Sequence, residues 1–175
     1  MSEQYALAGR GLKNVFIGQI LCILSFFPFV GPILAIIGLV LNLVGLNTAS
    51  QAHPGYKTAF TVAIVSIVVS ILSIFLSFLS IVTTILGLVM VYYICTTSAE
   101  LLGAKGDAYQ AAKGLSVWKL YLGCTVVTVV CLLLAFIPII NIFAAIVSVI
   151  AAIVLLVAGI LYVIFLYKAQ ESLQM

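Results

Sequence analysis

Residues 120–167 form an unbroken run of forty-eight residues without a charged side chain or a histidine. A single helix of that length would be roughly twice as long as the ~30 Å hydrocarbon layer of a bilayer is thick. The run therefore predicts two membrane helices joined by a turn at residues 137–141, which contain Pro138. Two blocks of similar length precede it, because residues 14–56 and residues 58–99 contain no Asp, Glu, Lys or Arg. These three apolar blocks constrain the fold more than any other feature of the chain.

Composition determines the class of fold. Only 6% of the residues are charged, against about 25% in a soluble domain, and the mean hydropathy is +1.42. Inside a bilayer every backbone amide must find its partner within the protein, so only helices or a closed barrel can cross. Barrel strands alternate apolar and polar residues, whereas these blocks are apolar on every face. The sequence thus predicts an all-α integral membrane protein with a single membrane domain over residues 1–175.

Turn signals and segment lengths divide the chain into six transmembrane helices. Their expected ranges are about 12–27, 32–49, 58–77, 81–99, 117–136 and 141–168. In pairs they form three helical hairpins, at about 12–49, 58–99 and 117–168. Residues 1–12 are then a polar lead-in, and residues 100–119 are the longest polar connection. The third and fourth helices are separated at residues 77–80 on length alone, since residues 58–86 contain no Gly, Pro, Asn or Asp.

The distribution of charge predicts the topology. All seven basic and all four acidic residues lie in four polar segments, 1–13, 47–57, 100–119 and 168–175. The alternate turns, 28–32, 77–80 and 137–141, hold none. Since basic residues mark the cytoplasmic side of a membrane protein, we expect both termini in the cytoplasm (N-in/C-in). The pattern leaves open whether the uncharged turns cross the outer leaflet or stay re-entrant.

Short internal similarities indicate that the hairpins are repeats of one unit. Residues 11–16 read GLKNVF and open the first hairpin, and residues 55–60 read GYKTAF and open the second. Residues 114–118, GLSVW, open the third less faithfully. The sequence therefore predicts three repeated helical hairpins.

Two sets of small or polar residues recur at helical spacing inside the apolar blocks. The first consists of Gly31, Ala35, Gly38, Asn42, Gly45 and Ala49, and the second of Ser66, Ser70, Ser73, Ser77 and Ser80. Because the spacings alternate between three and four, each set lies along one face and predicts a seam for close helix packing. For the serines, the alternative is a hydroxyl-lined path for a polar solute.

Gln19 and Asn42 are the two amides deepest in the first apolar block. Each lies eleven or twelve residues from the turn at Val30 and Gly31, so an antiparallel hairpin sets them at one depth. We expect a hydrogen bond between the two side chains, which would fix the register of the hairpin. Contact with a ligand is the alternative.

Several function classes lack the residues that they need. Proton- and ion-coupled transporters use ionisable groups at mid-membrane depth, and the apolar blocks contain none at that depth. The groups that could serve in acid–base catalysis, such as His53, Glu100 and Asp107, lie in the polar connections. The four cysteines form no Cys-x-x-Cys pair and are expected to be buried apolar groups. We therefore expect no catalytic residue, no metal, no cofactor and no nucleic-acid partner.

Two stretches carry a resemblance to known proteins. With residues 11–20 reading GLKNVFIGQI and residues 53–60 reading HPGYKTAF, the chain resembles small multi-pass membrane proteins of unassigned function from Gram-positive bacteria. The similarity covers mainly the first hundred residues, implies the plasma membrane of a bacterium, and implies no functional residue. In length and helix count the chain is also similar to the substrate-binding subunits of energy-coupling-factor vitamin importers, whose outer loops are long where these turns are short.

Two functions follow from this architecture. In the first, the chain is non-catalytic and packs against lipid, a membrane-protein partner or a second copy, with residues 100–119 and 47–57 as the docking surface. A variant is curvature generation, in which short hairpins wedge into one leaflet. In the second, the chain is a transporter or channel, or a subunit of one, for a neutral or hydrophobic solute. Transport predicts a solute-sized cavity between the helices at 32–49, 58–77 and 141–168.

Overall fold

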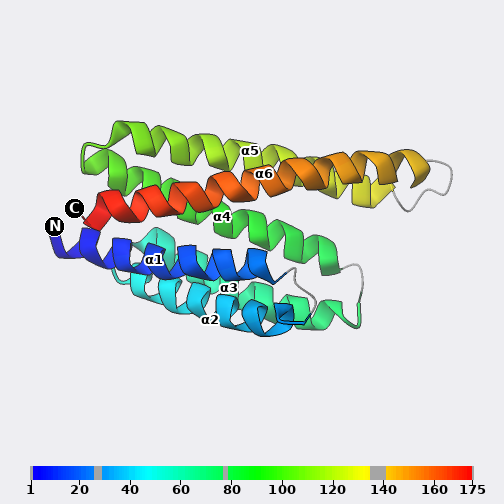
Figure 1. Cartoon of the computed structure of the whole chain (residues 1–175), viewed down its shortest axis with the longest axis horizontal. Helices are drawn as coiled ribbons and strands as arrows, with labels where there is room; N and C mark the ends of the chain where they lie inside the picture. The colour runs from blue at the N-terminus through cyan, green and yellow to red at the C-terminus, as the bar shows by residue number, and fades with distance from the viewer. Residues whose placement is uncertain (1, 26–28, 77–78, 135–140, 175) are drawn as a thin grey trace.

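The protein is all-helical in the part of the chain that the computed structural model describes, residues 2–25, 29–76, 79–134 and 141–174 (Figure 1). The helices are α1 (Ser2–Leu24), α2 (Gly31–Ser50), α3 (Pro54–Ser73), α4 (Leu79–Ala104), α5 (Ala108–Leu134) and α6 (Asn141–Gln174). Each of these six contains a segment long and apolar enough to cross a membrane. The fold is therefore that of a multi-pass helical membrane protein.

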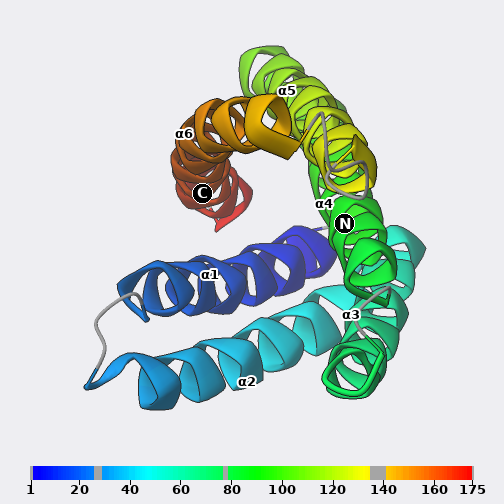
Figure 2. The ribbon, with the colours of Figure 1, turned by 90° about the vertical axis from the view of Figure 1, so that its right-hand side faces the viewer.

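The helices form a ring in chain order. Each helix packs against the next, α1 closes the ring against α6, and α4 also touches α6. Figure 2 shows this arrangement, with α1 and α2 side by side and α3, α4, α5 and α6 following around. The closest association is that of α1 with α2, but α4 packs against α5 as extensively as against α3. The hairpins are thus joined into one bundle rather than kept as separate units.

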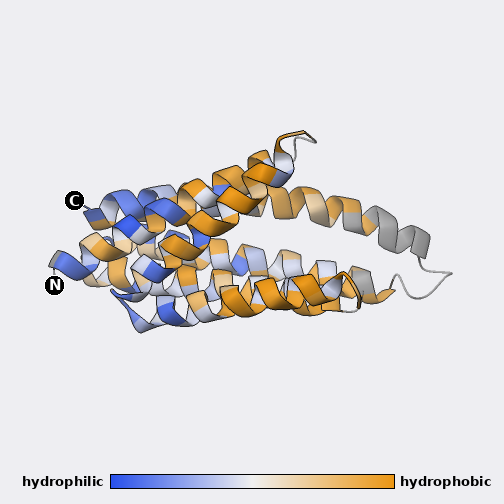
Figure 3. Cartoon of the chain, turned by 90° about the horizontal axis from the view of Figure 1, so that it is seen from below, coloured by the Kyte–Doolittle hydropathy of each residue, from blue (hydrophilic) through white to orange (hydrophobic). Residues whose placement is uncertain are grey.

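The two ends of the bundle differ in polarity. Hydrophilic residues gather at the end where α1 begins and α6 ends, and apolar residues dominate toward the opposite end (Figure 3). We call the first the charged end; it also holds the connections at residues 51–53 and 105–107. The second, where α1, α3 and α5 end, is the apolar end. The charge pattern of the sequence is therefore also a pattern in space.

At the charged end the helices are longer than the sequence predicts. α1 begins at Ser2 instead of residue 12, and residues 100–119 are helical apart from the short connection at 105–107. The prediction that these segments lie outside the helices was wrong. They are rich in Ala, Leu, Gln and Lys, which favour helix in water as well. Gly106 makes the tight turn possible with a φ of 96°.

The turn between α3 and α4 also lies elsewhere than predicted. α3 ends at Ser73, and Leu79 and Ser80, which were expected in the turn, are the first residues of α4. The connection between the two helices therefore includes residues 74–76, while Ser77 and Phe78 lie outside the described residues. No glycine, proline, Asn or Asp marks this turn, so the sequence gives no local signal for its position.

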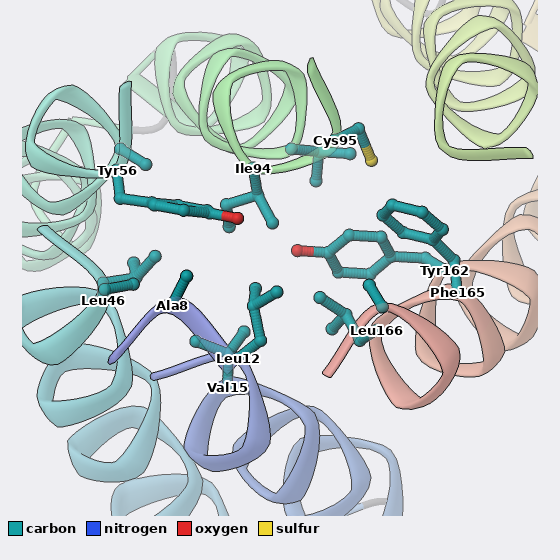
Figure 4. Packing of buried hydrophobic residues seen from close by; sticks show 14 of the residues in the cluster. Ala8, Leu12, Val15, Leu46, Tyr56, Ile94, Cys95, Tyr162, Phe165 and Leu166 are labelled. Atoms are coloured by element: carbon teal, nitrogen blue, oxygen red, sulfur yellow. The ribbon is translucent and has the colours of Figure 1, made fainter. Parts of the chain in front are cut away.

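A buried cluster at the charged end is the core of the bundle. All six helices contribute to it, with Ala8, Leu12, Val15, Leu46, Tyr56, Ile94, Cys95, Leu102, Val117, Tyr162, Phe165 and Leu166 among its members. Figure 4 shows that the rings of Tyr56 and Tyr162 point toward one another across its centre. Toward the apolar end, large aliphatic side chains such as Ile36, Ile71 and Val130 are exposed on the outside of the bundle. The packed core therefore occupies the half of the bundle that is nearer the charged end.

Glycines bring the backbones of α1 and α2 together. A Cβ atom on Gly45 would lie 2.6 Å from the carbonyl oxygen of Gly11, and one on Gly38 would lie 2.7 Å from that of Gly18. Real Cβ atoms do not approach backbone that closely, so only glycine fits at these positions. The seam predicted for α2 thus faces a second pair of glycines on α1, seven residues apart.

We predict that Gly45→Val destabilises the protein, because backbone atoms of Gly11 and Val15 block the new side chain. Overpacking of this kind costs about 1–3 kcal/mol. The measurement is the thermal unfolding midpoint of the purified chain in detergent micelles. Gly87→Val on α4 is the matched control, since a Cβ there meets nothing within 4 Å. Equal midpoints for the two variants would contradict the close approach of α1 and α2.

Candidate functional site

The structure places Gln19 and Asn42 side by side in the membrane-spanning part of the first hairpin. The Gln19 Nε2 group donates to Asn42 Oδ1 at 3.4 Å, and both side chains are half-buried. The Asn42 Nδ2 group in turn points at the Cys22 sulfur at 4.0 Å. Both distances are long for hydrogen bonds. The contact therefore links α1 and α2 only weakly.

Glycine packing explains why these side chains meet. A Cβ on Gly18 would lie 2.7 Å from the carbonyl oxygen of Gly38 and 3.0 Å from the side chain of Asn42. Gly18 thus leaves the space that Asn42 occupies, and the backbone approach brings the amide of Gln19 within reach. The polar pair depends on the glycine seam rather than the reverse.

A small cavity of about 160 Å³ adjoins Asn42. Its walls come from α1, α2, α3 and α4, and they include Cys22, Asn42, Ser66 and Met90. The structure therefore brings one of the predicted serines, Ser66, to the same cavity as Asn42. Sites for organic ligands usually measure about 300–1,000 Å³, so the space suits water better than a solute. Cys22 and Met90 were not among the residues expected at this place.

The other serines do not gather around a path. The Ser70 hydroxyl donates to the backbone carbonyl of Ser66 at 2.7 Å, and that of Ser73 donates to Ser70 at 2.7 Å. Ser70 and Ser80 are exposed on the outside of their helices, and Ser77 lies outside the described residues. Serine commonly satisfies its hydroxyl in this way inside a lipid-facing helix, by bonding to the preceding turn.

The cavity at Asn42 differs from the one that transport predicts. The expectation placed it between α2, α3 and α6, but no residue of α6 lines the cavity at Asn42. Larger cavities, of about 290 and 440 Å³, lie instead between α5 and α6. Sequence reasoning missed them, because they depend on how two helices fail to fill the space between them.

Polar contacts at the charged end tie the connections to the helices. His53 caps α3 by accepting from the Gly55 amide at 3.2 Å, and its other ring nitrogen lies 3.8 Å from a Glu100 carboxylate oxygen. In the core, Tyr56 and Ser98 share a buried hydrogen bond of 2.8 Å. These pairs join α3 to α4, and no local sequence signal relates their members.

Asp107, the third of the ionisable groups considered for acid–base catalysis, has a structural role as well. Asp107 caps α5 by accepting from the backbone amide of Gln110 at 3.1 Å, and it accepts from the Ser172 hydroxyl at 2.8 Å. Lys105 donates to the backbone carbonyl of Ser172. Among the described residues, no three His, Cys, Asp or Glu side chains come close enough together to hold a metal ion. His53, Glu100, Lys105 and Asp107 thus act as helix caps or as ties between elements.

We predict that Gln19→Ala and Asn42→Ala show a coupling energy of about 0.6 kcal/mol when combined, the average for hydrogen bonds between membrane helices. The measurement is the free energy of unfolding in detergent for both single variants and the double variant. Gln19→Ala combined with Ser116→Ala is the control, because Ser116 on α5 bonds to its own helix, and additive losses are expected. Additivity for Gln19 and Asn42 as well would show that the two amides do not interact.

Comparison with known proteins adds no relative. No family model, no curated protein and no solved structure matches the chain. What the chain does must therefore be argued from its own geometry: a glycine-packed hairpin with a weak amide pair, a core at the charged end, and a groove between α5 and α6.

Proposed function

We propose that the chain is a non-catalytic multi-pass protein of a bacterial plasma membrane that acts by packing against a partner protein or lipid. The observation that carries the proposal is the separation of the molecule into a charged end and a wide surface of exposed aliphatic side chains. That surface fits hydrocarbon, while the charged end fits water and the headgroups. His53, Glu100, Lys105 and Asp107 are engaged in caps and ties there, which supports a role in binding rather than catalysis.

The orientation of the proposed protein follows from its charges. All seven basic residues lie in the segments 1–13, 47–57, 100–119 and 168–175, which belong to the charged end, and basic residues favour the cytoplasmic side. Both termini are then cytoplasmic. α2 has 20 residues, about 30 Å at helical rise, which matches the hydrocarbon thickness. With α1 at 23 residues, the first hairpin is long enough to cross, and this favours spanning over a wedge in one leaflet.

The docking surface for a partner is the charged end. Residues 47–57 and 100–119 meet there through the contact of His53 with Glu100. Close by, Gly55 approaches Thr97 in the preceding part of α4. The ties of Lys105 and Asp107 to Ser172 hold the same region to α6. Segments tied to neighbouring helices keep their geometry, so this end offers a pre-formed surface.

Transport of a hydrophobic solute is the second candidate function. It is favoured by the groove of about 440 Å³ between α5 and α6, which has the size of a site for an organic ligand. Its walls are largely aliphatic, so a neutral polar solute fits it poorly. The first function remains preferred, because the groove opens along the outside of the bundle, where Val127 and Ile150 are exposed.

Labelling of single cysteines tests the topology. In a chain whose four native cysteines are replaced by alanine, we predict that Phe29→Cys reacts with an impermeant thiol reagent added to intact cells, because this residue is 95% exposed at the apolar end. Gln51→Cys, at the other end of α2, is expected to react only after the cells are opened. Protection of Phe29→Cys in intact cells would support a re-entrant hairpin instead.

Photo-cross-linking tests the partner. A photoreactive amino acid in place of Tyr109, which is 67% exposed at the charged end, is predicted to give a discrete protein adduct in growing cells. The same amino acid in place of Ile74, which is 78% exposed at the apolar end, is expected to give lipid adducts only. A charged end that yields no protein adduct would leave lipid as the sole partner.

A further inference from the structure

A continuous groove runs along the outer side of the seam between α5 and α6. It consists of two cavities, of about 290 and 440 Å³, and Leu120 lines both. The first lies nearer the charged end, and its walls include Gln110, Lys113, Leu161 and Lys168. The second continues toward the apolar end. The groove therefore has a polar part and an apolar part in series along the membrane normal.

The apolar part has the shape for a hydrocarbon chain. Its walls include Gly123, Val127, Ile150, Ala151 and Val154. A Cβ on Gly123 would meet nothing within 4 Å, so the protein leaves this space open. From Lys113 to Val127, α5 rises about 21 Å, which exceeds the roughly 15 Å of hydrocarbon in one leaflet. A lipid chain can lie along the groove with its headgroup among the polar residues.

The groove carries positive charge on its side toward the charged end. Lys113 and Lys168 line the first cavity, and Lys119 lines the second, next to Leu120, which the two cavities share. Lys168 pairs with Glu171 at 3.1 Å; within the part of the chain that the structure describes, neither Lys113 nor Lys119 has a carboxylate within ion-pair distance. Three lysines against one glutamate leave two positive charges in excess. Basic pockets between membrane helices on the cytoplasmic side suit anionic headgroups.

A buried amide adds a second polar feature at the same place. The Oε1 atom of Gln110 is enclosed, and no described group of the protein donates to it. An enclosed acceptor without a donor costs free energy. Gln110 lines the cavity that also holds Lys113 and Lys168.

We infer that the α5–α6 groove binds one anionic glycerophospholipid, with its phosphate near Lys113 and Lys119 and an acyl chain along Gly123 and Val127. The inference rests on the membrane orientation proposed above and names the lipid among the partners of the protein. A second copy of the chain fits less well, because a two-fold interface sets the same patch against itself. The lysines of the two copies would then repel one another.

Lipid binding by the purified full-length chain tests the inference. The chain in neutral detergent is mixed with equal amounts of phosphatidylglycerol and phosphatidylcholine with the same acyl chains, and bound lipids are counted by native mass spectrometry. We expect one tightly held phosphatidylglycerol. Lys113→Gln with Lys119→Gln lowers the preference for phosphatidylglycerol about thirtyfold, as expected for two basic groups near a headgroup. Lys13→Gln with Lys57→Gln, the control pair of exposed lysines on α1 and α3, leaves the preference unchanged.

A second pair of variants tests the apolar part without changing charge. Gly123→Leu fills the groove and is expected to remove one bound lipid, whereas Gly87→Leu, where a Cβ also has open space, leaves the number unchanged. If the control pair of lysine variants lost the preference for phosphatidylglycerol as much as the Lys113 and Lys119 pair, the lipid would be attracted by the basic surface as a whole. That result would overturn the site. Unchanged lipid binding in Gly123→Leu would overturn it too, as would a dimer that this variant separates. A helical wild-type chain without the preference would refute the lipid site and leave the proposed function, which the labelling and cross-linking test, intact.

Discussion

All six helices contribute described residues to the buried cluster at the charged end, and the rest of the bundle depends on it. Its position has a physical reason. Where a bundle meets water, burial of apolar side chains is driven by the hydrophobic effect. In the hydrocarbon, lipid tails are as apolar as leucine, and this driving force is absent. Leu12, Tyr56 and Leu166 are therefore fully buried, while aliphatic side chains nearer the apolar end stay against lipid.

Association along the rest of each helix then requires close packing, and the helices differ in whether they achieve it. On α1 and α2, glycines stand opposite each other, and the backbones come within contact. On α5, a Cβ on Gly123 would meet nothing within 4 Å, and one on Gly159 of α6 would meet only the Tyr121 hydroxyl, at 3.9 Å. The first hairpin is consequently closed along its length, whereas the third leaves a groove. Glycine therefore allows close packing where a neighbouring backbone lies opposite, and it leaves open space where no neighbour does.

This contrast explains what the sequence could and could not predict. The apolar blocks were sufficient for six helices and for the gathering of charge at one end, because both depend on composition over long segments. The position of Gln19 opposite Asn42 followed from counting residues outward from one turn. The start of α1 at Ser2 did not follow, since helix continues past the hydrocarbon wherever the residues favour it. Contacts such as Tyr56 with Ser98 and the α5–α6 groove depend on neighbours far apart in sequence, and no spacing within one segment encodes them.

The charged end and the groove are connected through α6. Asp107 and Lys105 hold the connection between α4 and α5 against Ser172 near the end of α6. Phe165 meets Gly114 of α5 closely, since a Cβ there would lie 2.7 Å from its ring. These contacts fix the distance between α5 and α6 at the level of the lysines. For the proposed lipid, the aliphatic walls of the groove farther into the membrane would not distinguish one hydrocarbon chain from another. Selectivity among lipids would therefore have to come from the lysines toward the charged end.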